Sequence, residues 1–390
     1  MTGHDERATP VHQASPPALT HDVEFTDVRP GEDQPWDRLE AHLREHVPGI
    51  TGEFVVKQFP NGSANLTYFV GIGETQLVVR RPPFGMLAPG AHDMRREFRA
   101  VSGLSTVFDR VAKGYAFCDD HSVIGSDFLV VEYRSGVVVW DHVPASMAHF
   151  DNAGSRIGNA VVDTLADLHL VDPAAAGLSD LGRPVGFVTR QVTGWRKRWS
   201  LVDEGRVPLM AVVGDRLEAG IPAESAQVSV LHNDYKIDNC QFDPTNPDRV
   251  KTIFDWDMAT IGDPLADLGT LLNYWPDPSD VEGARPLHVP GLEKMGLPSR
   301  VEIVQRYAAR TGFDVSGIAW YEAFATWKTA VVLEQLYQRW VRGESTDQRM
   351  ADRGQPVARM AARAEELLDR VCGAVGSVPA PRAETQGAPQ

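Results

Sequence analysis

The chain has 390 residues, which is enough for two domains or two lobes that each bury a hydrophobic core. Its formal net charge of −15 disfavours non-specific binding to nucleic acid, because a negative surface repels the phosphate backbone. With no apolar run of membrane-spanning length, no basic-then-apolar leader pattern and three widely separated cysteines, we expect a cytoplasmic protein without a membrane partner, a disulfide framework or a cysteine-based metal site.

The first third of the sequence carries short helical and β-like patterns. Residues 1–33 are rich in Pro, Ser, Thr and charge, and we expect them to form a disordered arm. Residues 36–47 show the apolar spacing of a helix, and a second helical face starts at Met94. Strands are predicted at 54–59, 66–72, 76–80 and 126–133. Together these elements indicate a small antiparallel β lobe.

Helical spacing dominates the rest of the chain, with one strand-like island. Helices are predicted over 157–170, 185–202, 301–311 and 320–342. The break at Arg134, Ser135 and Gly136 marks the lobe boundary. We therefore expect an α+β fold of two lobes. Its parts are an N-lobe at 34–134, a helical C-lobe at 135–375 and a disordered tail at 376–390.

The strand-like island contains the most informative motif of the chain. Residues 232–239 read His-x-Asp-x-Lys-x-x-Asn, and a second Asp, Asp255, ends an apolar strand soon after. This is the spacing of a kinase catalytic loop. Asp234 would accept the proton of a substrate hydroxyl, while Asn239 and Asp255 would hold the Mg²⁺ that bridges the ATP phosphates. The motif predicts a phosphotransferase that uses ATP and Mg²⁺.

Three alternatives can be weighed against this interpretation. His232 and Asp234 could instead be two ligands of a non-haem iron triad, although such a fold would be strand-rich around the site. A pseudokinase would bind nucleotide without turnover, but the complete set of Asp234, Asn239 and Asp255 argues against it. A protein kinase is disfavoured because only seven residues separate Asp255 from Asp263, too few for a peptide-binding activation segment. The acceptor should be a hydroxyl of a small molecule.

Candidate nucleotide-binding residues lie in the predicted β lobe. The Gly-containing hairpin before residue 66 offers Ser63 and Asn65 as a cover for the phosphates. The strand at 76–80 ends in Arg80, where a kinase would carry its phosphate-binding lysine. Guanidinium is a good bidentate phosphate ligand, and Glu97 on the next helix would hold it. Arg81 is the second candidate for this role, and because neighbouring strand residues point to opposite faces, we expect one of the two to face the cleft and the other solvent.

Other polar residues of the motif region and the lobe boundary complete the predicted site. Glu132 and Tyr133 would present backbone groups to the adenine edge, and Lys236 would contact the transferring phosphate. Asp263 suits the N-cap of a helix that begins at the following proline. Asp267, one turn inside that helix, could brace the catalytic loop by accepting hydrogen bonds from its backbone.

The motifs at 232–239, 254–257 and 262–268 together resemble the aminoglycoside phosphotransferase and choline kinase family. Residues 77–83 and 96–98 resemble a subgroup whose kinase module also occurs fused to acyl-CoA dehydrogenases. The resemblance covers residues 36–370 and implies a protein-kinase-like fold, ATP and Mg²⁺, with Asp234 as base and Asn239 and Asp255 as metal ligands. Asn233 departs from the usual glycine, and Arg80 from the lysine that many members carry.

The acceptor is less well determined by the sequence. Residues 195–199 form a basic aromatic helical segment, and other aromatic or basic side chains could line the same cleft, namely Trp275, Trp327, Lys328 and Trp340. A cationic aminoglycoside would call for a mainly acidic pocket, whereas a basic rim favours an acceptor with a carboxylate or phosphate, such as a hydroxyacyl thioester. The alternative is that these aromatic residues belong to the core and the charges are solvated.

Overall fold

The computed structural model describes residues 25–59, 65–85, 92–278, 280, 289–345 and 347–375, the last four of these as backbone only. It divides into two compact units. The first unit comprises Met1–Met94 and Gly114–Val137, and the second comprises Arg95–Lys113 and Val138–Gln390. The arm expected at 1–33 falls largely outside the described residues, and the tail expected at 376–390 does so entirely.

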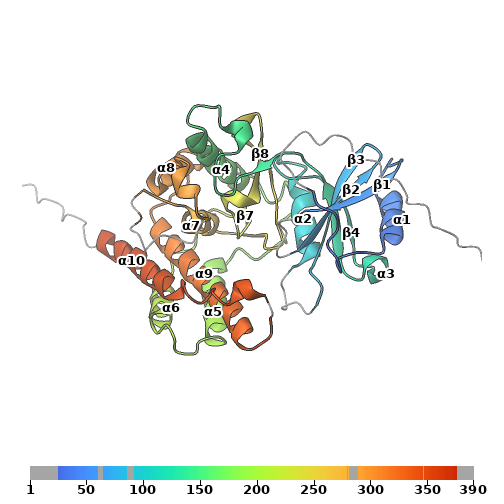
Figure 1. Cartoon of the computed structure of the whole chain (residues 1–390). Helices are drawn as coiled ribbons and strands as arrows, with labels where there is room; N and C mark the ends of the chain where they lie inside the picture. Colours follow the sequence, from blue (N-terminus) through green and yellow to red (C-terminus); the bar gives the residue numbers. More distant parts are fainter. Residues whose placement is uncertain are drawn as a thin grey trace, which may run out of the picture. The chain divides into compact units, whose positions relative to one another are not determined.

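The first unit is built on a five-stranded sheet in the order β1-β2-β3-β5-β4, in which all neighbours are antiparallel (Figure 1). Its elements are α1 (Trp36–His46), β1 (Phe54–Gln58), β2 (Leu66–Ile72), β3 (Thr75–Arg81), β4 (Gly114–Cys118), α3 (His121–Ile124) and β5 (Phe128–Glu132). The helix and four strands expected here are confirmed to within a few residues. The sequence pattern did not predict β4 and α3.

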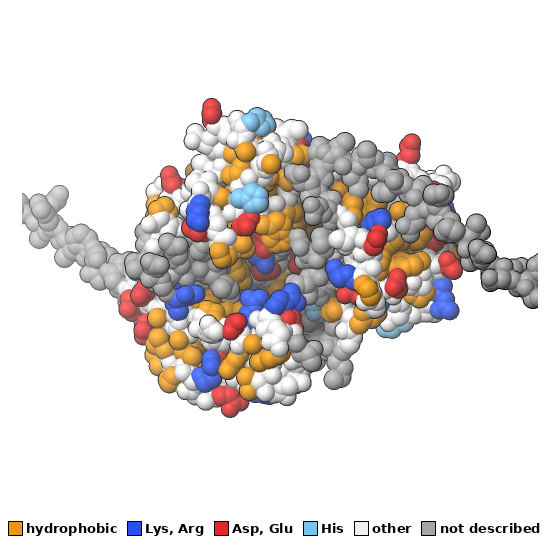
Figure 2. Space-filling model, in the orientation of Figure 1, with side chains coloured by type: hydrophobic (Ala, Val, Ile, Leu, Met, Phe, Trp, Pro, Cys, Tyr) orange, Lys and Arg blue, Asp and Glu red, His pale blue; other side chains and the backbone are white. Residues whose placement is uncertain are grey.

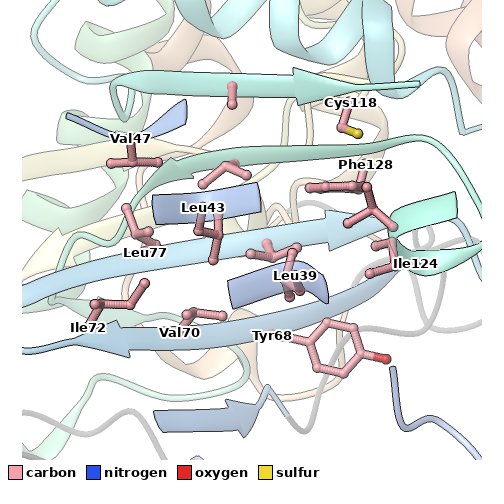
Figure 3. Close-up of a cluster of buried hydrophobic side chains, with 14 of the residues drawn as sticks. Leu39, Leu43, Val47, Tyr68, Val70, Ile72, Leu77, Cys118, Ile124 and Phe128 are labelled. Carbon is pink, nitrogen blue, oxygen red and sulfur yellow. The ribbon is translucent and has the colours of Figure 1, made fainter. Parts of the chain in front are cut away.

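The core of the first unit lies between α1 and one face of the sheet (Figure 3). Leu39 and Leu43, one helical turn apart on α1, are fully buried. They meet side chains that alternate along the strands, including Tyr68, Val70 and Leu77. Because burying each such side chain stabilises the fold by roughly 1.5–3 kcal/mol, this single layer fixes the register of β2 and β3.

The second unit is mainly helical and contains two small sheets (Figure 1). Its helices are α2 (Met94–Leu104, from its second residue), α4 (Ala153–His169), α5 (Phe187–Ser200), α6 (Leu209–Ala219), α7 (Leu265–Tyr274), α8 (Arg300–Thr311), α9 (Ile318–Val341) and α10 (Val357–Val375). The short 3₁₀ turns are η1 (Ala145–Met147), η2 (Ile237–Asn239), η3 (Leu292–Lys294) and η4 (Gln348–Met350). None of the helices in the described ranges is long and apolar enough to cross a bilayer.

The remaining strands form two small sheets. β7 (Ser229–Leu231) pairs with β10 (Thr260–Gly262), and β8 (Cys240–Asp243) lies between β6 (Val137–Val138) and β9 (Asn246–Ile253). The strand-like island of the sequence corresponds to β7, β8 and β9. The helices expected at 157–170, 185–202, 301–311 and 320–342 are α4, α5, α8 and α9, whereas α6 and α10 were not predicted.

Helix α2 belongs to the second unit because its basic side chains are anchored there. Arg96 donates to the carbonyl oxygens of Leu181 and Ala259, at 3.0 and 2.9 Å. Arg99 forms an ion pair with Asp180 at 2.5 Å. A division at residues 134–135, as expected from the sequence, would place this helix in the first unit, because sequence continuity does not reveal these long-range contacts.

Candidate active site

The three polar residues of the catalytic motif are brought together by strand ends in the second unit. Cys240 pairs with Ile253 in the β8–β9 hairpin, so Asn239 and Asp255 lie just beyond its open end. The N–H of Phe254 donates to the carbonyl of Asn239 at 3.1 Å, which continues the pairing by one step. Asp234 comes three residues after the end of β7. The local sheet geometry therefore gathers residues that are five and sixteen positions apart.

His232 ties the loop to the end of β9. The ring is fully buried, its Nε2 lies 3.0 Å from the carbonyl oxygen of Phe254, and its Nδ1 lies 3.3 Å from the backbone nitrogen of Asp234. Nε2 must donate to the carbonyl while Nδ1 accepts, which fixes one neutral tautomer. Because both nitrogens are engaged within the protein, His232 is not placed to ligate a metal, and the geometry does not support the iron-triad alternative.

Asp267 on α7 holds the backbone of the same loop. Its two carboxylate oxygens accept from the N–H groups of His232 and Asn233 at 2.6 and 2.7 Å, which confirms the bracing role expected from the sequence. Burial favours a raised pKa for this carboxyl, but the hydrogen bond and charge of His169 and the proximity of His232 outweigh it, so the pKa of Asp267 is lowered. His169 in turn lies 2.6 Å from the hydroxyl of Tyr307.

The residue between His232 and Asp234 adopts a left-handed backbone conformation. Asn233 has φ +64°. Glycine adopts this conformation without strain, and asparagine is among the other residues that tolerate it best. Its Nδ2 donates to the carbonyl of Met258 at 2.9 Å, which fixes the loop on a second side. Asp255 also has a positive φ, +72°. Such conformations in non-glycine residues are typical of functional sites.

Asp234 stands among polar neighbours at the exposed end of the loop. Lys236 Nζ lies 3.3 Å from Asp234 Oδ2 and 3.8 Å from Asp238 Oδ2, and 5.5 Å from the ring centroid of Tyr274. Burial alone would lower the pKa of Lys236, but the carboxylates of Asp234 and Asp238 outweigh it, and the pKa is raised. Lys236 is therefore a cation held against the Asp234 carboxylate rather than a solvated loop side chain.

The donor set at the hairpin end fits a magnesium ion. Asn239 Nδ2 donates to the backbone oxygen of Asp234 at 2.8 Å, so within the described ranges its amide oxygen is left as an acceptor without a protein donor. Asp255 adds a carboxylate at the neighbouring position. Burial is the main cause of the raised pKa of Asp238, and the negative charge of Asp255 adds to it. Amide and carboxylate oxygens are the hard ligands that Mg²⁺ prefers.

The helix that carries Asp267 starts one residue later than the sequence indicates. Pro264 occupies the N-cap position of α7 rather than its first helical position. Asp263 lies before it and accepts from the N–H of Leu265 at 3.0 Å. Its other oxygen accepts from the hydroxyl of Tyr321 at 2.5 Å, and burial raises its pKa. Asp263 thus has the structural role that was expected.

In the first unit, the two arginines at the end of β3 differ in their partners. Arg81 is buried and donates to Gln34 Oε1 at 2.6 Å and to the carbonyl of Ile124 at 2.9 Å. The expectation that one of the pair faces solvent is wrong, since Arg80 is buried as well, on the opposite face of the strand. With Arg81 committed to the fold, Arg80 is the better candidate for the phosphate contact. Glu97 is buried on α2.

The remaining nucleotide candidates of the first unit are partly described. Ser63 lies outside the described residues. Asn65 is buried, its Oδ1 lies 2.8 Å from His92 Nδ1, and its Nδ2 has no hydrogen-bond partner among the residues that the structure describes. Because an unpaired buried donor costs about 1–3 kcal/mol, a ligand oxygen at this position would be favourable.

Glu132 and Tyr133 follow each other at the end of β5. Glu132 accepts from Arg134 at 2.9 Å. The N–H of Tyr133 donates to the carbonyl of Gln76 at 3.2 Å, so it is not available to adenine, and its buried ring packs among the aromatic rings of Phe25, Phe59 and Phe69. The backbone N–H of Tyr133 is therefore ruled out as a contact of the adenine edge.

Residues 55–321 match the Phosphotransferase enzyme family. The chain belongs to this family. The mouse protein Acyl-CoA dehydrogenase family member 11 is 31% identical over 318 residues, which cover 80% of this chain and 40% of that protein. The chain thus spans less than half the length of this relative. The resemblance inferred from the motifs is confirmed, including the subgroup that occurs in acyl-CoA dehydrogenase family members.

Solved structures support the same assignment. A Ralstonia eutropha protein assigned to the aminoglycoside phosphotransferases is 31% identical, with a TM-score of 0.73 over 87% of this chain and 99% of that chain. A spectinomycin phosphotransferase, solved with ADP and spectinomycin, shares the fold at 11% identity, with a TM-score of 0.54 over 85% of this chain and 98% of that one. The α+β kinase-like fold is confirmed, and family phosphotransferases act on small molecules.

Proposed function

We propose that this phosphotransferase transfers the γ-phosphoryl group of ATP to a hydroxyl of a small molecule, with Asp234 as general base. The observation that carries the proposal is the arrangement of Asp234 beside Asn239 and Lys236, on a loop whose backbone Asp267 holds at two consecutive N–H groups. Phosphoryl transfer requires mainly positioning and charge compensation, which such a fixed loop can provide.

Each residue of the loop has a role that its position supports. The Asp234 carboxylate would accept the proton of the acceptor hydroxyl as the hydroxyl oxygen attacks the γ-phosphorus. The bond from that phosphorus to the β–γ bridging oxygen breaks, and ADP leaves with its electron pair. Asn239 and Asp255 would hold Mg²⁺, which when bound offsets the charge of the phosphate oxygens. The Lys236 ammonium, 3.3 Å from the base, would both orient the carboxylate and face the transferring group. A pseudokinase is the alternative, and measured turnover separates the two.

Candidate nucleotide contacts of the first unit complete the proposal. The bound ADP of the spectinomycin phosphotransferase supports a nucleotide as phosphoryl donor. Arg80 would contact the phosphates, with Glu97 as its partner, and Ser63 and Asn65 would cover them. Adenine would meet backbone carbonyl groups near Glu132 and Tyr133. We also propose that the protein is located in the cytoplasm.

The metal assignment predicts a loss of nucleotide binding. Replacing Asp255 with Asn should weaken Mg²⁺-ATP binding by at least about tenfold, because a neutral amide replaces a charged oxygen ligand. Affinity for ATP in the presence of EDTA should change little. Calorimetric titration with and without Mg²⁺ measures both quantities, and thermal melting checks that the fold is intact. Unchanged Mg²⁺-ATP affinity would remove Asp255 from the metal site.

Replacing Arg80 and replacing Arg81 on β3 should change different properties of the protein. Arg80→Ala should raise the KM for ATP or lower kcat by at least about tenfold, which is about 1.4 kcal/mol. Arg81→Ala should instead lower the melting temperature, since Gln34 and the Ile124 carbonyl lose their donor. Arg80→Lys, which restores the residue usual in the family, is the matched control and should retain most activity. Equal, small kinetic effects would mean that neither arginine binds phosphate.

The function itself is tested by an ATP-consumption screen across hydroxylated metabolites. Hits should give a phosphorylated product by ³¹P NMR and should require Mg²⁺. The same screen with Asp234→Asn should give no product above background. ATP binding without turnover on any acceptor class would favour the pseudokinase alternative.

A further inference from the structure

Two cationic side chains from different helices gather on one buried indole ring of the second unit. Trp195 on α5 is buried, and the guanidinium carbon of Arg198, one turn further on, lies 4.3 Å from its ring centroid. The ammonium of Lys328, from α9, lies 5.6 Å from the same centroid. Trp195 thus belongs to the core, which was one of the two alternatives left open by the sequence, but it also contacts one cation from its own helix and one from α9.

The helix that carries Lys328 is fixed on three sides. The indole nitrogen of Trp327 donates to the carbonyl of Met210 on α6 at 2.8 Å, and Thr329 accepts from Asn273 on α7 at 3.0 Å. Lys328 itself donates to the carbonyl of Asn233, the residue before the base, at 3.2 Å. Its ammonium is therefore held at the catalytic loop by packing that does not depend on a ligand.

Helix α5 packs against β10, the strand that leads to α7. A Cβ atom at Gly262, the last residue of β10, would lie 2.8 Å from the ring of Phe187, the first residue of α5. The absence of that atom lets the helix approach the strand that leads to α7. Arg198 is exposed on this helix, so its guanidinium can reach a bound molecule.

Neither cation has an acidic partner among the residues that the structure describes, whereas nearby basic side chains do. Arg196, on the same helix, pairs with Asp215 and Glu218, and Lys236 pairs with Asp234. Red and blue side chains are interspersed on the face drawn in Figure 2, and the chain has a formal net charge of −15. A general excess of basic residues therefore does not explain two cations without an ion-pair partner in the described part of the chain.

The electrostatic balance at Lys328 points the same way. Burial lowers the pKa of this ammonium, and Arg198 lowers it further, while Asp234 and Asp267 oppose the shift without reversing it. The protein thus compensates the charged form of Lys328 only in part. An anion bound near both cations would complete that compensation.

We propose that Lys328 and Arg198 bind an anionic group of the acceptor, a carboxylate or a phosphate, so that its hydroxyl is presented to Asp234. This inference rests on the proposed function and names the class of acceptor. The guanidinium can bind such a group in bidentate fashion, and the ammonium contributes a point charge beside the loop. A cationic acceptor would be repelled from the same position.

Direct binding of three-carbon probes tests the proposal without turnover. Glycerol 3-phosphate, glycerate and glycerol are titrated calorimetrically into the nucleotide-free protein at constant ionic strength. The two anions should bind at least tenfold more tightly than glycerol. Comparison of the phosphate with the carboxylate shows which anion the pair prefers.

Variants assign the binding to the two cations. Lys328→Met and Arg198→Gln should each weaken binding of the anionic probes by at least fivefold, and Lys328→Arg should retain it within threefold. Lys197→Gln is the matched control, because Lys197 is an exposed lysine adjacent to Arg198 for which no contact with Trp195 is found among the described residues. This control should bind like the wild type.

Equal binding of all three probes, no measurable binding of either anion, or unchanged anion affinity in Lys328→Met would overturn the inference. A loss in Lys197→Gln as large as that in Arg198→Gln would do the same. Because the readout uses no ATP, failure here leaves the phosphotransfer proposal standing. Conversely, if the anions bind but no acceptor is phosphorylated, the anion site stands and the proposed phosphotransfer is wrong.

Discussion

Replacing Asp234 with alanine should lower kcat by roughly 10²–10⁴-fold, the usual contribution of a general base, while ATP affinity stays within about threefold. The carboxylate is the group that would receive the hydroxyl proton, and it is held by Lys236 at 3.3 Å and faced by the Asn239 amide at 3.4 Å. Steady-state kinetics with an acceptor from the screen, and calorimetric titration with Mg²⁺-ATP, measure the two quantities separately.

A neighbouring carboxylate provides the control for this experiment. Asp238 also lies near Lys236, at 3.8 Å, and burial raises its pKa. Asp238→Asn removes a charge of the same sign from the same cluster without touching the base, so its effect on kcat should be at least tenfold smaller than that of Asp234→Ala. If the two variants lose activity equally, the loss reflects the charge of the cluster and Asp234 is not the base.

The catalytic loop could be predicted from the sequence because its information is local. The spacing of Asp234 and Asn239 and the apolar strand before Asp255 specify a loop and a hairpin, and the pairing of Cys240 with Ile253 bears this out. Asp267 could also be anticipated, since a carboxylate one turn inside a helix that follows the loop can reach back to free N–H groups.

Contacts between residues far apart in the chain could not be predicted from the sequence. His169 ends α4 and Tyr307 lies 138 positions away, so no spacing rule links either of them to the loop. Arg81 shows a second limit. Strand alternation correctly placed Arg80 and Arg81 on opposite faces, but whether a face is covered depends on α1 and the segments around Gln34 and Ile124. Alternation gives orientation, whereas burial is decided by tertiary packing.

Removing the Asp267 carboxylate should have the largest effect on stability. In Asp267→Ala, the buried N–H groups of His232 and Asn233 lose their acceptor, and each unsatisfied group costs about 1–3 kcal/mol. We therefore expect the second unit to lose about 2–6 kcal/mol and, where it still folds, kcat to fall at least tenfold as the loop loosens. Asp180→Ala is the control, because the exposed ion pair of Asp180 with Arg99 in the same unit should contribute less than about 1 kcal/mol.

The pH dependence of this loss separates the carboxylate from simple side-chain volume. The folded pKa of Asp267 lies below its ordinary value of 3.8, so its contribution is fully present above that pH and is lost as the pH falls through the lowered folded value. The difference in unfolding free energy between wild type and Asp267→Ala should therefore shrink below about pH 4. Urea unfolding at a series of pH values measures it. A difference that does not change with pH would mean that a cavity, not the anionic brace on the loop, destabilises the variant.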